Sequence, residues 1–187
     1  MKKNLPVILL AIASLAAGFA VYHYTNEQPV KNASANIKQP VVKKSISIVG
    51  TKRADFSLFD LEGKKRHIRE WDGRVILLNF WATWCPPCRR ELPAFIKLQE
   101  QYGARGFQVL GVAIDEKQAV IDYIDGLGGN YPIMIGGKEV LAISAAYGNR
   151  FGQLPYSLVI DRKGIIRFIG KHELSFKDIE KQIQPLL

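Results

Sequence analysis

Cysteine, histidine and methionine are scarce in this chain of 187 residues, which has two cysteines, three histidines and two methionines. So few cysteines exclude a scaffold held together by several disulfides, and they exclude a zinc site with four cysteine ligands. A zinc site built on the two cysteines would need two further ligands, and the histidines (His23, His67 and His172) are scattered along the chain. The two cysteines must therefore be explained by other chemistry.

Acidic residues are the second group in short supply, with 17 against 26 basic residues and a net charge of +9. Residues 1–52 hold seven lysines and one glutamate, whereas the remaining 135 residues hold 19 basic and 16 acidic side chains. The basic charge thus belongs mainly to the start of the chain and not to its body. A nucleic-acid partner would need a basic surface on the folded part, so none is predicted.

Charged residues are absent from residues 5–22, a run of eighteen residues. As a helix this run would be roughly 27 Å long, close to the roughly 30 Å hydrocarbon thickness of a bilayer. Its length, the two lysines before it and the aromatic pair Tyr22 and Tyr24 at its far edge favour an uncleaved membrane anchor. The alternative is a signal peptide cleaved near residues 18–20, Gly-Phe-Ala. Under both interpretations the rest of the chain crosses the membrane.

The sequence divides into three parts. Residues 1–24 are the anchor or signal segment, and residues 25–49, rich in Asn, Gln, Lys, Ser and Pro, are expected to form a flexible linker. Residues 50–187 have the length and the apolar content of one domain.

Strand and helix patterns alternate through the middle of this domain, which predicts an α/β fold with a mixed central sheet and a β-hairpin at its start. Asp178 three residues after Ser175 indicates a capping box where the last helix begins. The expected strands are 56–60, 64–68, 75–81, 107–114, 131–135, 157–161 and 165–170. The expected helices are 86–103, 119–127, 139–147 and one that begins at Ser175.

The two cysteines stand in the motif Trp84-Cys85-Pro86-Pro87-Cys88, after a buried strand and at the start of a helix. Sulfurs at positions i and i+3 can close a small disulfide ring, so the pair is suited to reversible redox chemistry. The free N–H groups of a helix start favour a thiolate, which makes Cys85 the expected attacking sulfur. Cys88, one turn further, is the expected resolving thiol. Arg89 and Arg90 are expected to add positive charge nearby.

The stretch from Leu78 to Pro93, LNFWATWCPPCRRELP, resembles the thioredoxin superfamily, and in particular the TlpA/ResA/DsbE type of membrane-anchored thiol-disulfide oxidoreductase. The resemblance covers about residues 50–187. It implies a thioredoxin-like fold with a central αβ insert at residues 117–147 and a redox-active Cys85–Cys88 disulfide. It also implies a helix kinked at Pro93, no cofactor and no metal.

The resemblance also assigns roles to residues outside the cysteine pair. Leu154-Pro155 matches a cis-proline that lies against the redox pair, and a substrate is expected to contact Trp84, Leu154 and Tyr156. Thioredoxin has a buried aspartate where this chain has Asn79, and in this branch a glutamate that matches Glu91 takes a similar part. A partly buried Glu91 would relay protons to and from the cysteines; the alternative is an exposed glutamate paired with a basic side chain.

These features predict an exported, membrane-tethered oxidoreductase that reduces disulfides of extracytoplasmic proteins. The resemblance implies a membrane thiol electron donor of the DsbD/CcdA kind, with cytochrome c maturation as one family role. The domain would face the periplasm from the bacterial cytoplasmic membrane as a single-pass monomer, or be soluble in the periplasm after signal cleavage.

Three other functions compete with this prediction. The first is a disulfide-forming oxidant, whose attacking cysteine would have a pKa far below neutrality. The second is a thiol peroxidase. The reactive cysteine of such enzymes usually stands in a Pro-x-x-x-Thr-x-x-Cys motif, whereas here Trp84 precedes Cys85. The third, from a different class, is a copper or other metal chaperone, against which the lack of a suitable His or Met near the pair argues.

Overall fold

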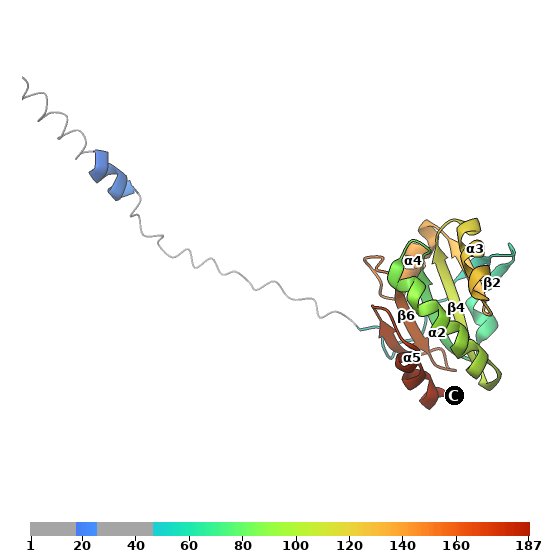
Figure 1. Cartoon of the computed structure of the whole chain (residues 1–187). Coiled ribbons are helices and arrows are strands. Elements are labelled where there is room, and N and C mark those ends of the chain that lie inside the picture. Colours follow the sequence, from blue (N-terminus) through green and yellow to red (C-terminus); the bar gives the residue numbers. More distant parts are fainter. Residues whose placement is uncertain (1–17, 26–46) are drawn as a thin grey trace, which may run out of the picture. The chain divides into compact units, whose positions relative to one another are not determined.

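The computed structural model describes residues 18–25 and 47–187, and elements carry the labels of Figure 1. Residues 18–25 form a helix with exposed side chains. The strands are β1 (Ser57–Asp60), β2 (Lys65–His67), β3 (Val75–Trp81), β4 (Phe107–Ile114), β5 (Ile133–Gly136), β6 (Tyr156–Ile160) and β7 (Ile166–Gly170). The helices are α2 (Pro86–Tyr102), α3 (Lys117–Leu127), α4 (Lys138–Ala146) and α5 (Phe176–Ile183), with 3-10 turns η1 (Ile68–Trp71), η2 (Gly103–Arg105) and η3 (Gln184–Leu186).

The strands form a seven-stranded mixed sheet in the order β2-β1-β5-β4-β3-β6-β7. Strands β3, β4 and β5 are parallel, whereas β6 runs antiparallel to β3 and β7 antiparallel to β6. The β1–β2 hairpin joins the other side of the sheet through an antiparallel β1–β5 pair. The predicted α/β class, mixed sheet and N-terminal hairpin are confirmed.

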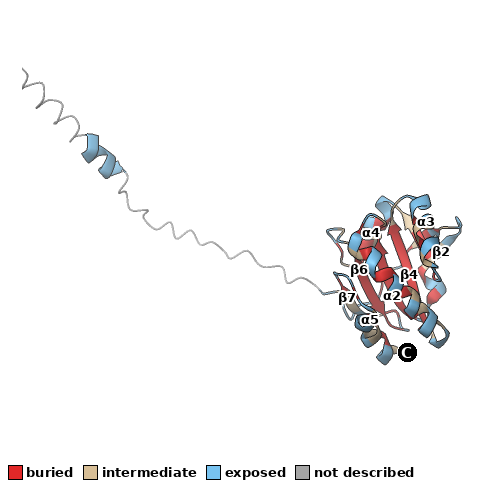
Figure 2. Cartoon of the chain, in the orientation of Figure 1, coloured by how far each residue is buried: buried red, intermediate tan, exposed pale blue. Residues whose placement is uncertain are grey.

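Side chains of β3 alternate between two cores, one on each face of the sheet. Odd-numbered residues such as Leu77 and Trp81 pack with residues of α2, α3 and α5. Even-numbered residues such as Leu78 and Phe80 pack with residues of α4 on the opposite face. Figure 2 shows the central strands as buried throughout. Asn79 belongs to the odd-numbered set, so a polar side chain lies in the middle of an apolar strand and points towards α2.

Helix α5 begins as the sequence predicts. The Ser175 hydroxyl accepts the Asp178 N–H, and the Asp178 carboxylate accepts the Ser175 N–H, which completes a capping box. Such a cap stabilises a helix by about 1 kcal/mol. It also fixes the course of the chain at Leu174, directly before the cap.

Most predicted boundaries hold to within one residue, and two of them move by two residues. Strand β5 begins at Ile133 and not at Tyr131, because Pro132 has no N–H to donate to a ladder. The Tyr131 side chain is instead buried in the core under α2. Helix α3 begins at Lys117, two residues before the predicted start.

Within residues 18–25 and 47–187, no helix is long and apolar enough to cross a bilayer. Most of the expected anchor or signal segment (1–24) and of the expected linker (25–49) lies outside the described residues. Both remain predictions.

Candidate functional site

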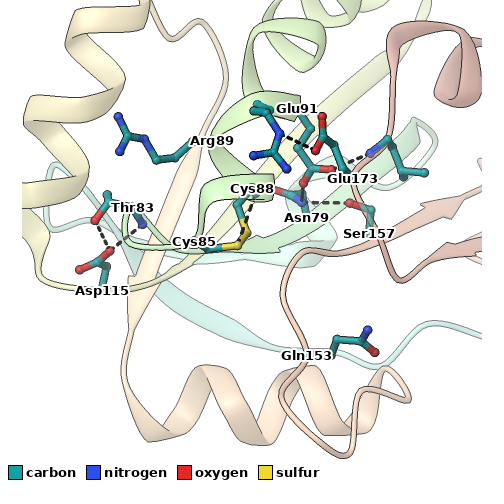
Figure 3. Close-up of a disulfide and its surroundings, with 12 residues drawn as sticks. Asn79, Thr83, Cys85, Cys88, Arg89, Glu91, Asp115, Gln153, Ser157 and Glu173 are labelled. Atoms are coloured by element: carbon teal, nitrogen blue, oxygen red, sulfur yellow. Dashed lines mark hydrogen bonds and ion pairs between the residues drawn. A yellow bond between two sulfur atoms is a disulfide. The ribbon is translucent and has the colours of Figure 1, made fainter.

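The cysteine pair lies at the junction between β3 and α2. Cys85 is the N-cap of α2, and Pro86 and Pro87 fill the first turn, where a missing N–H costs nothing. Cys85 and Cys88 form a disulfide with a Cα–Cα distance of 5.3 Å, drawn in Figure 3. The pairing expected from their spacing is therefore present.

The two sulfurs differ in their surroundings. The Cys88 N–H donates to Cys85 Sγ over 3.4 Å, as in a side-chain helix cap. Cys85 is 5% exposed, whereas Cys88 is 0% exposed. When the disulfide is reduced, the partial positive charge of the helix start acts on Cys85 and favours its thiolate. This geometry favours Cys85 as attacking sulfur and Cys88 as resolving sulfur.

The two arginines after the pair are each engaged elsewhere. Arg89 lies over the ring of Tyr123, 4.8 Å from its centroid, and points away from the disulfide in Figure 3. Arg90 Nε donates to the Glu173 carboxylate over 2.7 Å. The expected contribution of these arginines to a Cys85 thiolate is therefore weakened, and the helix start is the nearer source of positive potential.

Glu91 is buried and not a surface glutamate, with 1% of its surface exposed. Its Oε1 accepts from Asn79 Nδ2 over 2.8 Å, and its Oε2 accepts from the Leu174 N–H over 3.1 Å. Burial raises the pKa of Glu91 to about 8, although the hydrogen bonds from Leu174 and Asn79 act in the opposite direction. A carboxyl group that titrates near neutrality, one turn after Cys88, can hold or release a proton under ordinary conditions.

A row of small and polar residues crosses the sheet at Asn79, the partner of this carboxyl group. Asn79 pairs with Gly111 of β4 on one side and with Ser157 of β6 on the other. Ser157 in turn pairs with Gly170 of β7. Asn79 Nδ2 also donates to Ser157 Oγ over 2.9 Å. Sequence analysis missed Ser157, whose only signal is a hydroxyl residue inside a buried apolar strand.

The loop between β3 and α2 is fixed from the end of β4. The Asp115 carboxylate accepts the Thr83 N–H over 2.7 Å and the Thr83 hydroxyl over 2.5 Å. These bonds hold the chain just before Trp84, which is 65% exposed beside the disulfide. Trp84 is thus exposed at the surface, and its contact with a substrate stays a prediction.

The peptide bond Leu154-Pro155 is cis, as the resemblance implied. The loop that leads to it is held by Asn149, a buried residue that sequence analysis missed. Asn149 Oδ1 accepts the Gln153 N–H over 2.9 Å, and Asn149 Nδ2 donates to the Gln153 carbonyl over 2.8 Å. Its Nδ2 also donates to Ser144 Oγ over 2.9 Å. The N–H and the carbonyl of Gln153 thus both bond to the Asn149 side chain, in the way that they would bond to a neighbouring strand. These bonds order the segment directly before Pro155.

Tyr156 does not fit its expected role as a substrate contact. It is 1% exposed, and its hydroxyl donates to the Tyr147 carbonyl over 2.8 Å. As the first residue of β6 it pairs with Phe80, and its side chain packs in the core on the α4 face. Leu154 is half-buried, so Trp84 and Leu154 remain the surface candidates.

Residues 18–25 and 47–187 contain no group of three or more His, Cys, Asp or Glu side chains that could hold a metal ion.

The mixed sheet, the disulfide at a helix start and the neighbouring cis-proline define a thioredoxin-like thiol-disulfide oxidoreductase. Residues 49–169 match the AhpC/TSA family, and the chain belongs to this family. It is 33% identical over 181 residues to the thiol-disulfide oxidoreductase ResA of Halalkalibacterium halodurans, covering 95% of this chain and 92% of the relative. It is 35% identical over 153 residues to the thioredoxin-like protein YneN of Bacillus subtilis, covering 79% of this chain and 86% of the relative.

Solved structures agree with this assignment. A thiol:disulfide interchange protein of the thioredoxin family from Chlorobium tepidum superposes with a TM-score of 0.68 at 29% identity. The match covers 73% of this chain and 96% of that protein. The chain is therefore a thiol-disulfide oxidoreductase with a Cys-x-x-Cys redox pair.

The buried Glu91 predicts an unusual dependence of stability on pH. A glutamate in an unfolded chain titrates near pH 4.3, so between about pH 4.5 and pH 8 the folded protein holds a proton that the unfolded chain releases. The free energy of unfolding of the disulfide form should therefore fall as pH rises through this window, by on the order of 3 to 5 kcal/mol. Denaturant unfolding at pH 5, 6.5 and 8 measures it.

Glu91→Gln should remove this part of the pH dependence, because the amide does not titrate. Glu100→Gln, an exposed glutamate on the same helix, is the matched control and should retain it. Parallel pH profiles for Glu91→Gln and the unmodified protein would show that Glu91 titrates as an ordinary carboxyl group.

Proposed function

We propose that the protein is a membrane-tethered reductant that uses the Cys85/Cys88 dithiol to reduce disulfides of extracytoplasmic proteins. The observation that carries the direction is the environment of Glu91, a buried carboxyl group at position i+3 from Cys88 on α2. Its negative charge, when present, opposes a second negative charge on a thiolate nearby. Strong oxidants of this fold require the opposite, a reduced form stabilised as thiolate.

The reaction transfers two electrons to the substrate. The Cys85 thiolate attacks one sulfur of the substrate disulfide, which breaks the S–S bond, forms a mixed disulfide and releases the first substrate thiolate. Glu91 then takes the proton of Cys88, whose sulfur attacks Cys85 Sγ and expels the second substrate sulfur. The substrate leaves as a dithiol after taking up two protons, and Cys85–Cys88 is left oxidised.

Substrate docking involves Trp84 and the cis-proline loop. Trp84 offers an exposed aromatic surface on one side of the pair. Leu154 makes no hydrogen bond to another backbone group within residues 47–187, so its N–H and carbonyl are open to a substrate strand. We propose Trp84, Leu154 and Pro155 as the substrate contacts, and we leave out Tyr156.

The proposed location rests on the uncharged run near the start of the chain and on the likeness to thiol-disulfide oxidoreductases. The uncharged run at residues 5–22 supports a single-pass anchor in the bacterial cytoplasmic membrane, followed by a linker to residue 49 and by the redox domain. The domain would act in the periplasm or its equivalent as a monomer. A membrane thiol donor of the DsbD/CcdA kind would re-reduce it, and apocytochromes c are the proposed substrates.

Replacement of the resolving cysteine should trap the substrate. Cys88→Ala leaves Cys85 able to form the mixed disulfide but removes the sulfur that breaks it, so covalent complexes should accumulate in cells. Non-reducing gels, with and without reductant, followed by mass spectrometry identify the partners. Cys85→Ala is the matched control and should trap nothing. Complexes formed through Cys88 in that control would reverse the two roles.

The direction of the reaction is tested by redox equilibrium with glutathione. A reductant should have a reduction potential for Cys85–Cys88 below about −200 mV, nearer to thioredoxin than to DsbA. Alkylation of free thiols across a series of glutathione ratios gives the value. A potential near −120 mV, as in DsbA, would contradict the reductant and support the oxidant.

The anchor is tested by the fate of the amino terminus. The full chain, expressed in a bacterium, should sediment with membranes and keep its intact mass, whereas a chain starting at residue 26 should not sediment. Recovery of a soluble periplasmic form with a new terminus near residue 21 would replace the anchor by a cleaved signal.

A further inference from the structure

The Asn79 side chain has an unbalanced set of hydrogen bonds. Asn79 is 0% exposed, and its Nδ2 donates to both Glu91 Oε1 and Ser157 Oγ. Its Oδ1, equally buried, has no hydrogen-bond partner among the described residues. A buried polar atom without a partner is rare enough to require a physical reason.

The observed contacts suit only one protonation state of Glu91. An ionised carboxylate is purely an acceptor, so Asn79 Nδ2 and the Leu174 N–H both face a suitable partner. A protonated carboxyl group carries one O–H that must be donated. The Leu174 backbone N–H can only donate and therefore keeps Oε2 as its acceptor, so we place the O–H on Oε1, where it would meet the Asn79 NH2 group, a second donor.

A half-turn of the amide resolves this conflict. The C=O and NH2 groups of asparagine have nearly the same size, so they can exchange places without displacing neighbours. Oδ1 would then accept from the Glu91 O–H. Ser157 has a hydroxyl that either donates or accepts, so it can accept from Nδ2 before the turn and donate to Oδ1 after it.

We propose that the Asn79 amide turns when Glu91 gains or loses its proton, with Ser157 as the partner that serves both orientations. Asn79 and Ser157 are then positioning residues of the proton relay, an inference that rests on the proposed role of Glu91. They do not contact the substrate. Their effect is that Glu91 has a complementary partner both before and after proton transfer.

The other groups around Glu91 do not offer this exchange. Glu173 lies in the segment before α5, and its negative charge raises the pKa of Glu91. Its carboxylate is held at the surface by an ion pair with Arg90 of α2. Cys88, also on α2, bears the sulfur that exchanges protons. Before β5, Tyr131 is buried with no hydrogen-bond partner for its hydroxyl among the described residues, and burial raises the pKa of Tyr131 far above neutrality. Tyr131 thus stays neutral while Glu91 titrates.

Nuclear magnetic resonance of the unmodified full chain in detergent micelles tests the proposal. The disulfide form is used from pH 4 to pH 10, so that no cysteine titrates. The Glu91 carboxyl carbon reports its protonation, and nuclear Overhauser effects (NOEs) from the Asn79 NH2 protons to the Ser157 Hβ protons report the orientation of the amide. We expect these NOEs to be strong above the Glu91 midpoint and to fall severalfold below it.

A fixed amide would also shift its resonances as Glu91 titrates, but it would keep its NOEs to Ser157, and that result overturns the proposal. NOEs that persist while Glu91 stays protonated at every pH overturn it as well. A Glu91 midpoint near pH 4 to 5 would instead contradict the relay, and the NOEs would still decide the amide turn at that midpoint. Glu91→Gln is the matched control, in which the Asn79–Ser157 NOEs should not change with pH.

Discussion

The hydrogen bonds to the buried Glu91 carboxyl group join three segments that are far apart in the sequence. Asn79 reaches it from β3 and Leu174 from the chain before α5, while Glu91 itself lies on α2. A carboxyl group removed from water is tolerated only when its oxygens are satisfied. Any shift of α2 along the sheet would break these bonds, so they hold the helix that carries the cysteines. Burial raises the pKa of Glu91 to about 8 against the effect of the same bonds.

The sheet brings the remaining parts of the site to one edge. The parallel strands β3 and β4 end there, at Trp81 and Ile114, and the antiparallel β6 begins there, just after Pro155. Three loops therefore come to this edge, and two of them are held by one buried or half-buried side chain outside the cysteine pair. Asp115 holds the first loop at Thr83, and Asn149 holds the last at Gln153. The redox pair is ordered by contacts from its neighbours as much as by its own helix.

Local patterns in the sequence were sufficient for most of the fold. The continuous apolar runs predicted β3 and β4 with their observed bounds, and Ser175 with Asp178 predicted the start of α5. The spacing of the cysteines allowed a disulfide, and the resemblance implied one. The cis bond before Pro155 came from the resemblance, since spacing gives no such information.

The misses have a common cause in long-range contacts. Ser157 lies 78 residues from Asn79 and Asp115 lies 32 residues from Thr83, and neither pair has a local signal. Tyr156 was expected to contact a substrate, but its position in β6 directs its ring into the core with Phe80.

The ordered loop before Pro155 limits how a substrate can bind. Both backbone groups of Gln153 are already taken by Asn149, so a substrate strand cannot extend its pairing towards the start of the loop. In the proposed docking mode, pairing would be confined to Leu154, a single residue, and specificity would depend on side-chain contacts with Trp84. A substrate held by so few backbone bonds can leave readily once its disulfide is reduced, because after the Cys85–Cys88 bond closes no covalent link remains. This arrangement suits an enzyme that must release each substrate before its own dithiol is restored.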